Sequence, residues 1–202
     1  MDYTKIPSKD IINKTVQALK ENGMEVFIVD DREKAKRKIL DLIPRGAEIM
    51  NMTSVTLESL GIVKELENSD YELVKEKLAI MDRETQGREM QKLGAAPEWA
   101  IGSVHAITQD GKIMIASNTG SQIPAFVYGA DHVIFVVGMQ KIVKDLDQGF
   151  NRIYEHSLVL ESERARKAYG VSGSNVSKIL IVNREIKPNR IHIILIPEVL
   201  GF

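Results

Sequence analysis

Two short apolar runs, separated by a polar turn of small residues, constrain the fold of this chain most strongly. The runs cover residues 112–116 and 132–137, and each is rich enough in β-branched residues to form a buried strand. Between them, residues 117–122 combine hydroxyls and a glycine, which suit a chain reversal followed by the start of a helix. Backbone N–H groups at such a turn attract anions. This turn is therefore the first candidate for a ligand site.

The pattern before this stretch predicts an α/β domain. Strand-like runs at 25–29 and 47–52 alternate with helical patterns at 8–22, at 30–42 and after residue 54. Such alternation predicts an α/β fold around a parallel sheet with right-handed crossovers. At 202 residues the chain suits one buried domain, so we expect a single domain over residues 1–202, with residues 1–24 as an N-terminal helical extension.

Other segments complete the expected secondary structure. An Asp-Gly pair at 110–111 predicts a hairpin that leads from an apolar segment at 97–107 into the 112–116 run. Further elements are expected as a brief strand at 71–74, a polar helix at 82–93, helices at about 144–156 and 160–169, a loop at 170–175, and strands at 178–182 and 191–196.

Composition excludes several classes of protein. The net charge of −1 and the 5% aromatic content give no basis for nucleic-acid binding. The absence of cysteine excludes disulfides, thiol catalysis and cysteine-ligated iron–sulfur clusters within this chain. The first ten residues lack the apolar core of a signal peptide, and no apolar run reaches the length of a membrane span. We therefore expect a cytoplasmic protein that does not enter a membrane.

Three polar turns are expected at the carboxyl ends of strands, where open α/β sheets bind ligands. They cover residues 53–56, 117–122 and 138–141. A small anionic ligand is expected there because hydroxyls, backbone N–H groups and one lysine come together. The alternative is that the hydroxyls only cap helices and the lysine is solvated. The candidate ligand-binding residues are Ser54, Thr56, Ser117, Asn118, Thr119, Gly120, Ser121, Gln122, Gly138, Gln140 and Lys141.

The sequence points to no catalytic residue with comparable strength. His105 and Glu84 are candidates for general acid or base, although His105 also fits a structural, hydrogen-bonded histidine. No glycine-rich dinucleotide motif, Walker-type motif or nucleophile elbow is present, and the four histidines lack the spacing of zinc ligands. We therefore expect neither a metal nor a cofactor.

An ordered set of segments resembles a known family. Residues 106–112, 117–122, 129–134 and 137–146, together with 43–47, 53–57 and 193–202, resemble the LUD family, the lactate-utilisation domain. The resemblance implies a three-layer α/β fold with an open, mostly parallel sheet, similar to that of ribose-phosphate isomerases, glucosamine-phosphate deaminases and coenzyme A transferases. It also implies association with bacterial lactate oxidation, often beside iron–sulfur partner proteins.

The chain departs from the family pattern at two places. Many short members carry a cysteine-rich segment before the last strands, where this chain has residues 170–175 without cysteine, and Ser121-Gln122 stands where Asn-Arg is common. Three hypotheses follow: an accessory protein of 2-hydroxy-acid utilisation, an autonomous enzyme acting on a phosphosugar or coenzyme A ester, and a structural subunit of an oxidoreductase complex. The oligomeric state stays open, with a homo-oligomer among the options.

Overall fold

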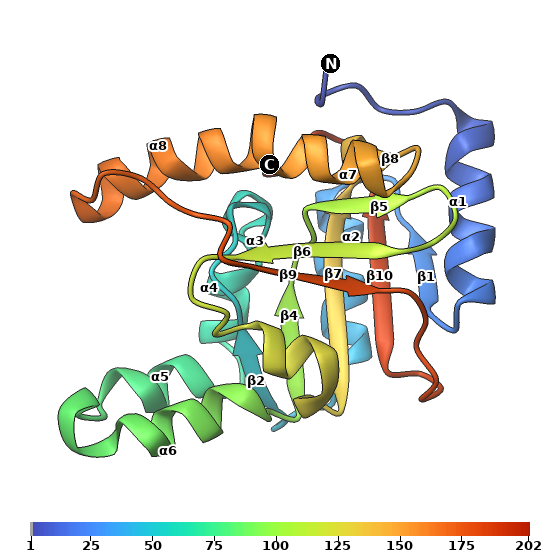
Figure 1. Cartoon of the computed structure of the whole chain (residues 1–202). Helices are drawn as coiled ribbons and strands as arrows, with labels where there is room; N and C mark the ends of the chain where they lie inside the picture. Colours follow the sequence, from blue (N-terminus) through green and yellow to red (C-terminus); the bar gives the residue numbers. More distant parts are fainter. Residues whose placement is uncertain (1) are drawn as a thin grey trace.

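The computed structural model describes residues 2–202 and contains two sheets (Figure 1). The larger sheet has six strands, and every neighbouring pair in it is parallel. In spatial order its strands are β1 (Glu25–Ile28), β10 (Ile191–Ile196), β7 (His132–Gly138), β4 (Trp99–Gly102), β2 (Glu48–Asn51) and β3 (Glu72–Leu73). The α/β class with a mostly parallel central sheet is thus confirmed.

The smaller sheet has four strands, which run across those of the larger sheet (Figure 1). They are, in spatial order, β8 (Ile142–Val143), β5 (Ala106–Thr108), β6 (Ile113–Ser117) and β9 (Lys178–Val182). The hairpin between β5 and β6 turns at Gly111, whose φ of 80° is the left-handed value for which glycine is favoured. The expected hairpin is therefore present.

The two apolar runs that constrain the fold lie in different sheets, as β6 and β7. An apolar run shows that a strand is buried on both faces, but it does not show which sheet the strand joins. The same holds for the last two strands, because β9 lies in the smaller sheet and β10 in the larger. The polar turn between the runs consequently carries the chain from one sheet to the other.

Helices cover the sheets and follow the capping chemistry of the sequence. They are α1 (Lys9–Glu21), α2 (Arg32–Leu42), α3 (Val55–Leu60), α4 (Ile62–Glu67), α5 (Val74–Ala79), α6 (Arg83–Ala95), α7 (Leu146–Arg152) and α8 (Leu158–Tyr169), with the shorter turns η1 (Ala125–Gly129), η2 (Met139–Lys141) and η3 (Ile153–Ser157). Asp31, Asp82 and Asp145 cap α2, α6 and α7 by accepting backbone N–H bonds. Ser54 occupies the N-cap position of α3 but makes no capping hydrogen bond.

The expected break between two C-terminal helices is absent. Instead α7, η3 and α8 follow one another without a gap, and η3 is a π-helical turn. A π-turn inserts an extra residue into the helix and shifts the 3.6-residue spacing of the apolar residues. In the sequence this shift resembles the end of one helix and the start of another. Turns of this kind are common at functional sites.

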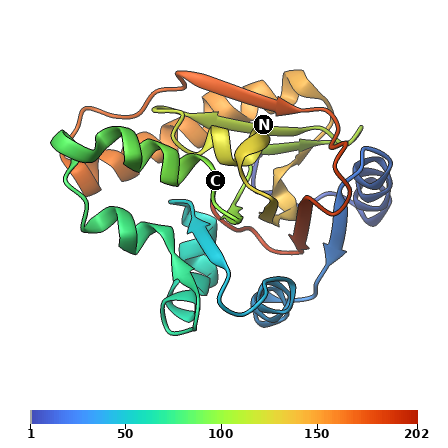
Figure 2. The same ribbon diagram turned by 90° about the horizontal axis from the view of Figure 1, so that it is seen from below.

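The core lies on both faces of the larger sheet, as the alternation along β7 shows. Val133, Phe135 and Val137 pack in a cluster shared with α1 and the smaller sheet. Ile134 and Val136 pack on the opposite face with α2, α3 and α4. Figure 2 shows the smaller sheet and α2 on opposite sides of the larger sheet. The outer face of the smaller sheet is covered in turn by α7 and η3, through a third cluster.

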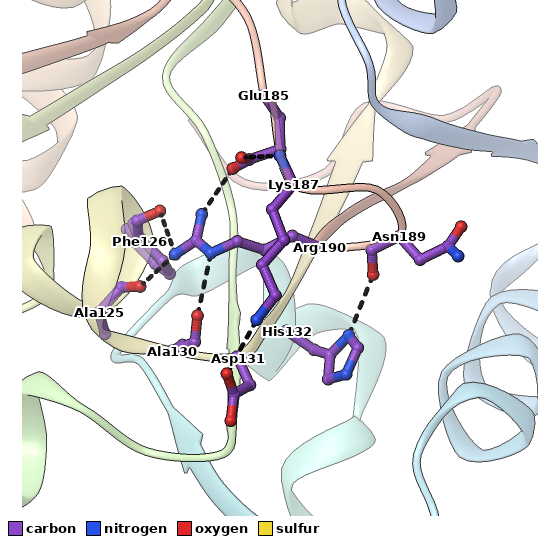
Figure 3. Close-up of polar contacts among 9 residues, drawn as sticks. All are labelled: Ala125, Phe126, Ala130, Asp131, His132, Glu185, Lys187, Asn189 and Arg190. Carbon is purple, nitrogen blue, oxygen red and sulfur yellow. Dashed lines mark hydrogen bonds and ion pairs between the residues drawn. The ribbon is translucent and has the colours of Figure 1, made fainter.

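A buried arginine connects the segments that precede β7 and β10, at the amino ends of these strands. Arg190 precedes β10 and is 4% exposed. Its Nε donates to the carbonyl of Ala130 at 3.0 Å, and its Nη2 donates to the carbonyls of Ala125 and Phe126 at 3.1 Å (Figure 3). Its Nη1 pairs with Glu185 at 2.8 Å. Arg190 therefore ties η1 to the connection between β9 and β10.

Two further contacts strengthen this edge. Lys187 Nζ lies 2.9 Å from the carboxylate of Asp131, and His132 Nδ1 lies 3.0 Å from the carbonyl of Asn189 (Figure 3). These side chains occupy the edge at which β7 and β10 begin. The opposite edge, where the parallel strands end, carries the candidate site.

Among residues 2–202, no helix combines the length and the apolar character needed to cross a membrane.

Candidate functional site

A pocket of about 380 Å³ lies at the carboxyl ends of β2, β4 and β7. We call it the central pocket. This is the edge at which open α/β sheets bind ligands, and the volume falls within the usual range for small-molecule sites. Its walls are formed by residues 52–56 after β2, 103–105 after β4, 116–119 at the end of β6, Lys141 after β7, and side chains of η3 and α8.

Most of the candidate ligand-binding residues line this one pocket. Residues from all three polar turns contribute, although the turns are far apart in the sequence. The candidates that line it are Ser54, Thr56, Ser117, Asn118, Thr119, Ser121, Gln122, Lys141 and, as the candidate acid or base, His105. Gly120, Gly138 and Gln140 do not line it, and Glu84 lies in the first turn of α6, also outside the lining.

The turn at residues 117–122 is held together by its own side chains. Ser117 Oγ accepts from the Gly120 N–H at 2.9 Å, and Thr119 Oγ1 accepts from the Ser121 N–H at 3.3 Å. Two backbone donors that we expected to face an anion are therefore already bonded. What this turn offers to a ligand is its hydroxyl and amide side chains rather than a row of free N–H groups.

The turn after β7 anchors the C-terminal segment. Gln140 is buried, and its Nε2 donates to the carbonyls of Leu200 and Gly201 at 3.0 and 3.3 Å. The segment that it holds brings Phe202 to the pocket wall. Gln140 thus shapes the pocket through the C-terminal segment instead of lining it.

Gly138→Ala is expected to lower the free energy of unfolding by about 1–3 kcal/mol, the usual cost of overpacking. A Cβ at this position would lie 2.2 Å from Gln140 Oε1 and 2.6 Å from the backbone oxygen of Glu198. Urea denaturation followed by circular dichroism measures the change. The matched control is Gly94→Ala, since a Cβ there meets nothing within 4 Å. Equal midpoints for the two variants would contradict the packing described for this turn.

Lys141 is the most unusual side chain of the central pocket. It is 1% exposed, and its Nζ donates to Thr56 Oγ1 and Ser103 Oγ at 3.1 Å and to the carbonyl of Val104 at 3.0 Å. Within residues 2–202 no carboxylate lies within ion-pair distance of it. Burial, and secondarily the charge of Arg152, lower the pKa of Lys141 well below its ordinary value. The alternative of a solvated lysine is therefore wrong.

His105 is a neutral hydrogen-bond donor in this environment. Its Nδ1 accepts from the Ala116 N–H at 3.1 Å, so the ring proton resides on Nε2. Burial lowers the pKa of His105 to about 3, with further contributions from Lys141 and Arg152. At neutral pH the ring can therefore donate to a ligand oxygen, but it is a weak base.

Arg152 lies behind the pocket wall. It is fully buried, and its Nη1 donates to the carbonyl of His105 at 2.7 Å and to Ser157 Oγ at 3.1 Å. Its Nε and Nη2 have no hydrogen-bond partner within residues 2–202. Burial lowers the pKa of Arg152 to about 10, which still leaves it charged at neutral pH. It adds positive potential near the pocket and fixes the position of the His105 backbone.

The rim of the pocket is also basic. Lys75 on α5 is half-buried, and burial lowers its pKa. Arg164 on α8 forms two hydrogen bonds to Glu161, at 2.7 and 2.8 Å. Because the Glu161 charge is paired with Arg164, no acidic side chain among the described lining residues is left to pair with Lys75 or Lys141.

Sequence reasoning missed several of these residues. Ser103 directly follows β4, so the same argument from strand ends could have found it. Arg152, Lys75 and Arg164 lie on helices whose polar residues look solvated, and no local pattern distinguishes them. Within residues 2–202 no cluster of three or more histidine, aspartate or glutamate side chains is placed to hold a metal ion.

Comparison with known proteins agrees with the family resemblance and with the fold. The family model of the LUD domain matches residues 12–196. A crystal structure of a DUF162 family protein from Deinococcus radiodurans is similar with a TM-score of 0.58 and 13% sequence identity, over 94% of this chain and 99% of that one. None of the curated proteins matches the sequence significantly. Since the family model covers most of its length, the chain belongs to the LUD domain family.

Proposed function

We propose that this LUD domain binds a small anionic acid of the 2-hydroxy or 2-oxo class in the central pocket, as an accessory component of lactate or related 2-hydroxy-acid oxidation. The family is associated with lactate utilisation. The observation that carries the proposal is the convergence of three polar turns around the buried amine of Lys141.

The charges around the pocket favour an anion. Lys75, Lys141 and Arg164 line it, whereas Glu161, the acidic side chain in its lining within residues 2–202, is paired with Arg164. Arg152 adds a buried positive charge behind the wall. A low-dielectric site with this excess of cationic groups stabilises a bound carboxylate or phosphate.

The hydroxyls supply the remaining donors. Ser54 makes no cap bond to α3, and Ser103 Oγ accepts from the Lys141 amine. Thr56 Oγ1 also accepts from this amine, but it donates to the carbonyl of Leu200 at 3.3 Å. A ligand carboxylate placed among them would accept several hydrogen bonds, of which those from charged donors are the strongest. In this proposal, cysteine-ligated iron–sulfur clusters belong to partner proteins, because this chain contains no cysteine.

Thermal unfolding in the presence of ligands tests the proposal. We expect lactate or pyruvate to raise the melting temperature, and a ligand at a hundred times its Kd stabilises the folded state by about 2.7 kcal/mol. The panel also contains inorganic phosphate and acetyl-coenzyme A, which represent the enzyme hypothesis. Lys141→Met, alone or with Thr119→Ala, is expected to abolish the shift.

Lys144→Met is the matched control, because Lys144 is close in sequence but 71% exposed and outside the pocket lining. The shift should persist in this variant. An undiminished shift in Lys141→Met would contradict the assignment of the site. If no member of the panel stabilised the wild-type protein, a purely structural subunit would become the better account.

A further inference from the structure

Lys141 differs from the other lysines of the chain in what surrounds its amine. Lysines such as Lys36 and Lys77 each contact two carboxylates, and Lys144 is exposed. The Lys141 Nζ instead meets two hydroxyls and one carbonyl inside a pocket wall. A structural lysine that is buried is expected to have a charged partner, because an unpaired buried charge is costly. This one calls for another explanation.

We propose that Lys141 is a nucleophile that forms an imine with the carbonyl carbon of a small 2-oxo acid bound in the central pocket. The inference rests on the proposed function, since it takes the acid to occupy the same pocket. It adds an activity to that function, in which the bound 2-oxo acid is held covalently and reversibly.

The environment makes the amine reactive. Only an unprotonated amine carries the lone pair that attacks a carbonyl carbon, and desolvation next to another cation is the known way to obtain it. Both conditions hold here, because Lys141 is 1% exposed and the charged Arg152 lies nearby. The pKa of Lys141 is lowered accordingly, which increases the share of the amine that is unprotonated and able to attack, while the protonated share attracts the acid.

The chemistry balances within the site. The Nζ lone pair attacks the carbonyl carbon, the carbonyl oxygen takes up a proton, and Nζ loses one, which gives a carbinolamine. The hydroxyl then takes up a second proton and leaves as water, so that a protonated C=N bond replaces the C=O bond. Loss of the remaining proton from nitrogen gives the neutral imine. No oxidant or reductant is needed. Ser103 Oγ, 3.1 Å from Nζ, can relay these protons.

His105 can assist the addition step. Its proton resides on Nε2, and its ring lines the same pocket. A neutral imidazole donor stabilises the negative charge that develops on a carbonyl oxygen. The carboxylate of the acid would lie toward the hydroxyl-lined wall, where Ser54 and Ser117 also line the pocket.

Reductive trapping tests the proposal. The intact protein is incubated with pyruvate and cyanoborohydride near neutral pH, digested and mapped by mass spectrometry. We expect one carboxyethyl group on Lys141, at least about tenfold more abundant than on any exposed lysine, because exposed lysines with a pKa near 10.4 are almost entirely protonated. Mapping the wild-type protein makes the result independent of whether a variant folds.

The variants and a second ligand separate this inference from the proposed function. Lys144→Met should be trapped at Lys141 as the wild type is, whereas Lys141→Met should lose the pocket label. Labelling spread over exposed lysines without enrichment at Lys141 would overturn the imine. If lactate, which has no ketone, stabilised the protein while pyruvate gave no label at Lys141, anion binding would stand and the imine would fail. If neither ligand stabilised or labelled the protein, both proposals would fail.

Discussion

Replacing Arg190 by methionine is expected to lower the free energy of unfolding by about 3–5 kcal/mol, the range for breaking a buried ion pair from one side. The change leaves Glu185, whose side chain is 11% exposed, without its partner. It also removes the donors that satisfy the carbonyls of Ala125, Phe126 and Ala130. Urea denaturation followed by circular dichroism measures the loss.

Two further variants show whether this reading of Arg190 is correct. Arg190→Lys keeps the charge but lacks the planar fork, so it should recover only part of the stability. Arg184→Met changes an exposed arginine in the same connection and should alter stability by no more than about 0.5 kcal/mol. The smallest loss that we expect for Arg190→Met is about 3 kcal/mol. A loss below about 1 kcal/mol would show that these contacts do not hold the edge as described.

The folded protein is expected to lose stability steeply as the pH falls below about 6.5, the ordinary pKa of histidine. Burial lowers the pKa of His192 and lowers that of His105 to about 3. The unfolded chain therefore binds these protons first. The free energy of unfolding is therefore unaffected by these histidines above their pKa in the unfolded chain. Below that pKa it declines by up to about 1.4 kcal/mol per pH unit for each such histidine.

His192 is the better residue for testing this, because it lies outside the central pocket. Both of its ring nitrogens are buried without hydrogen-bond partners within residues 2–202, and the ring stacks near Trp99 and Phe27. The charges of His132 and Lys38 also lower the pKa of His192, whereas the backbone of Asn189 and the charge of Glu25 raise it. His192→Phe should reduce the slope of unfolding free energy against pH just below about 6.5, by up to about 1.4 kcal/mol per pH unit. Identical slopes for variant and wild type would refute the assignment.

The position of the candidate site could be inferred from the sequence because it depends on local patterns and one general rule. Each polar turn follows a recognisable apolar run, and the carboxyl ends of parallel strands meet at one edge. Ser54, Ser117 and Lys141 were brought together by this argument alone, and the structure places all three in the central pocket wall.

The state of those side chains could not be predicted in the same way. The burial of Lys141 depends on Thr56, which lies 85 residues away in the sequence, and on Ser103 and Val104. The polar turn around Gln140 predicts a ligand-binding residue, yet the acceptors of its amide are carbonyls of the C-terminal segment. The local sequence does not show that this segment packs against the turn. Burial and hydrogen bonding over such separations come from tertiary packing.

The smaller sheet escaped prediction for a related reason. β6 and β7 are similar apolar runs, and the sequence does not distinguish strands that are buried in different sheets. Arg190 was missed because its carbonyl acceptors lie 60 or more residues away, on η1 and just after it. A single arginine beside a turn is expected to be solvated, because the sequence does not show which distant carbonyls it contacts.

A crystal structure of the protein soaked with lactate tests the central claim most directly. We expect the acid in the central pocket, with a carboxylate or hydroxyl oxygen within hydrogen-bond distance of Lys141 Nζ, at about 2.7–3.2 Å. A pocket that stays empty at saturating lactate, or lactate bound only elsewhere on the molecule, would contradict it.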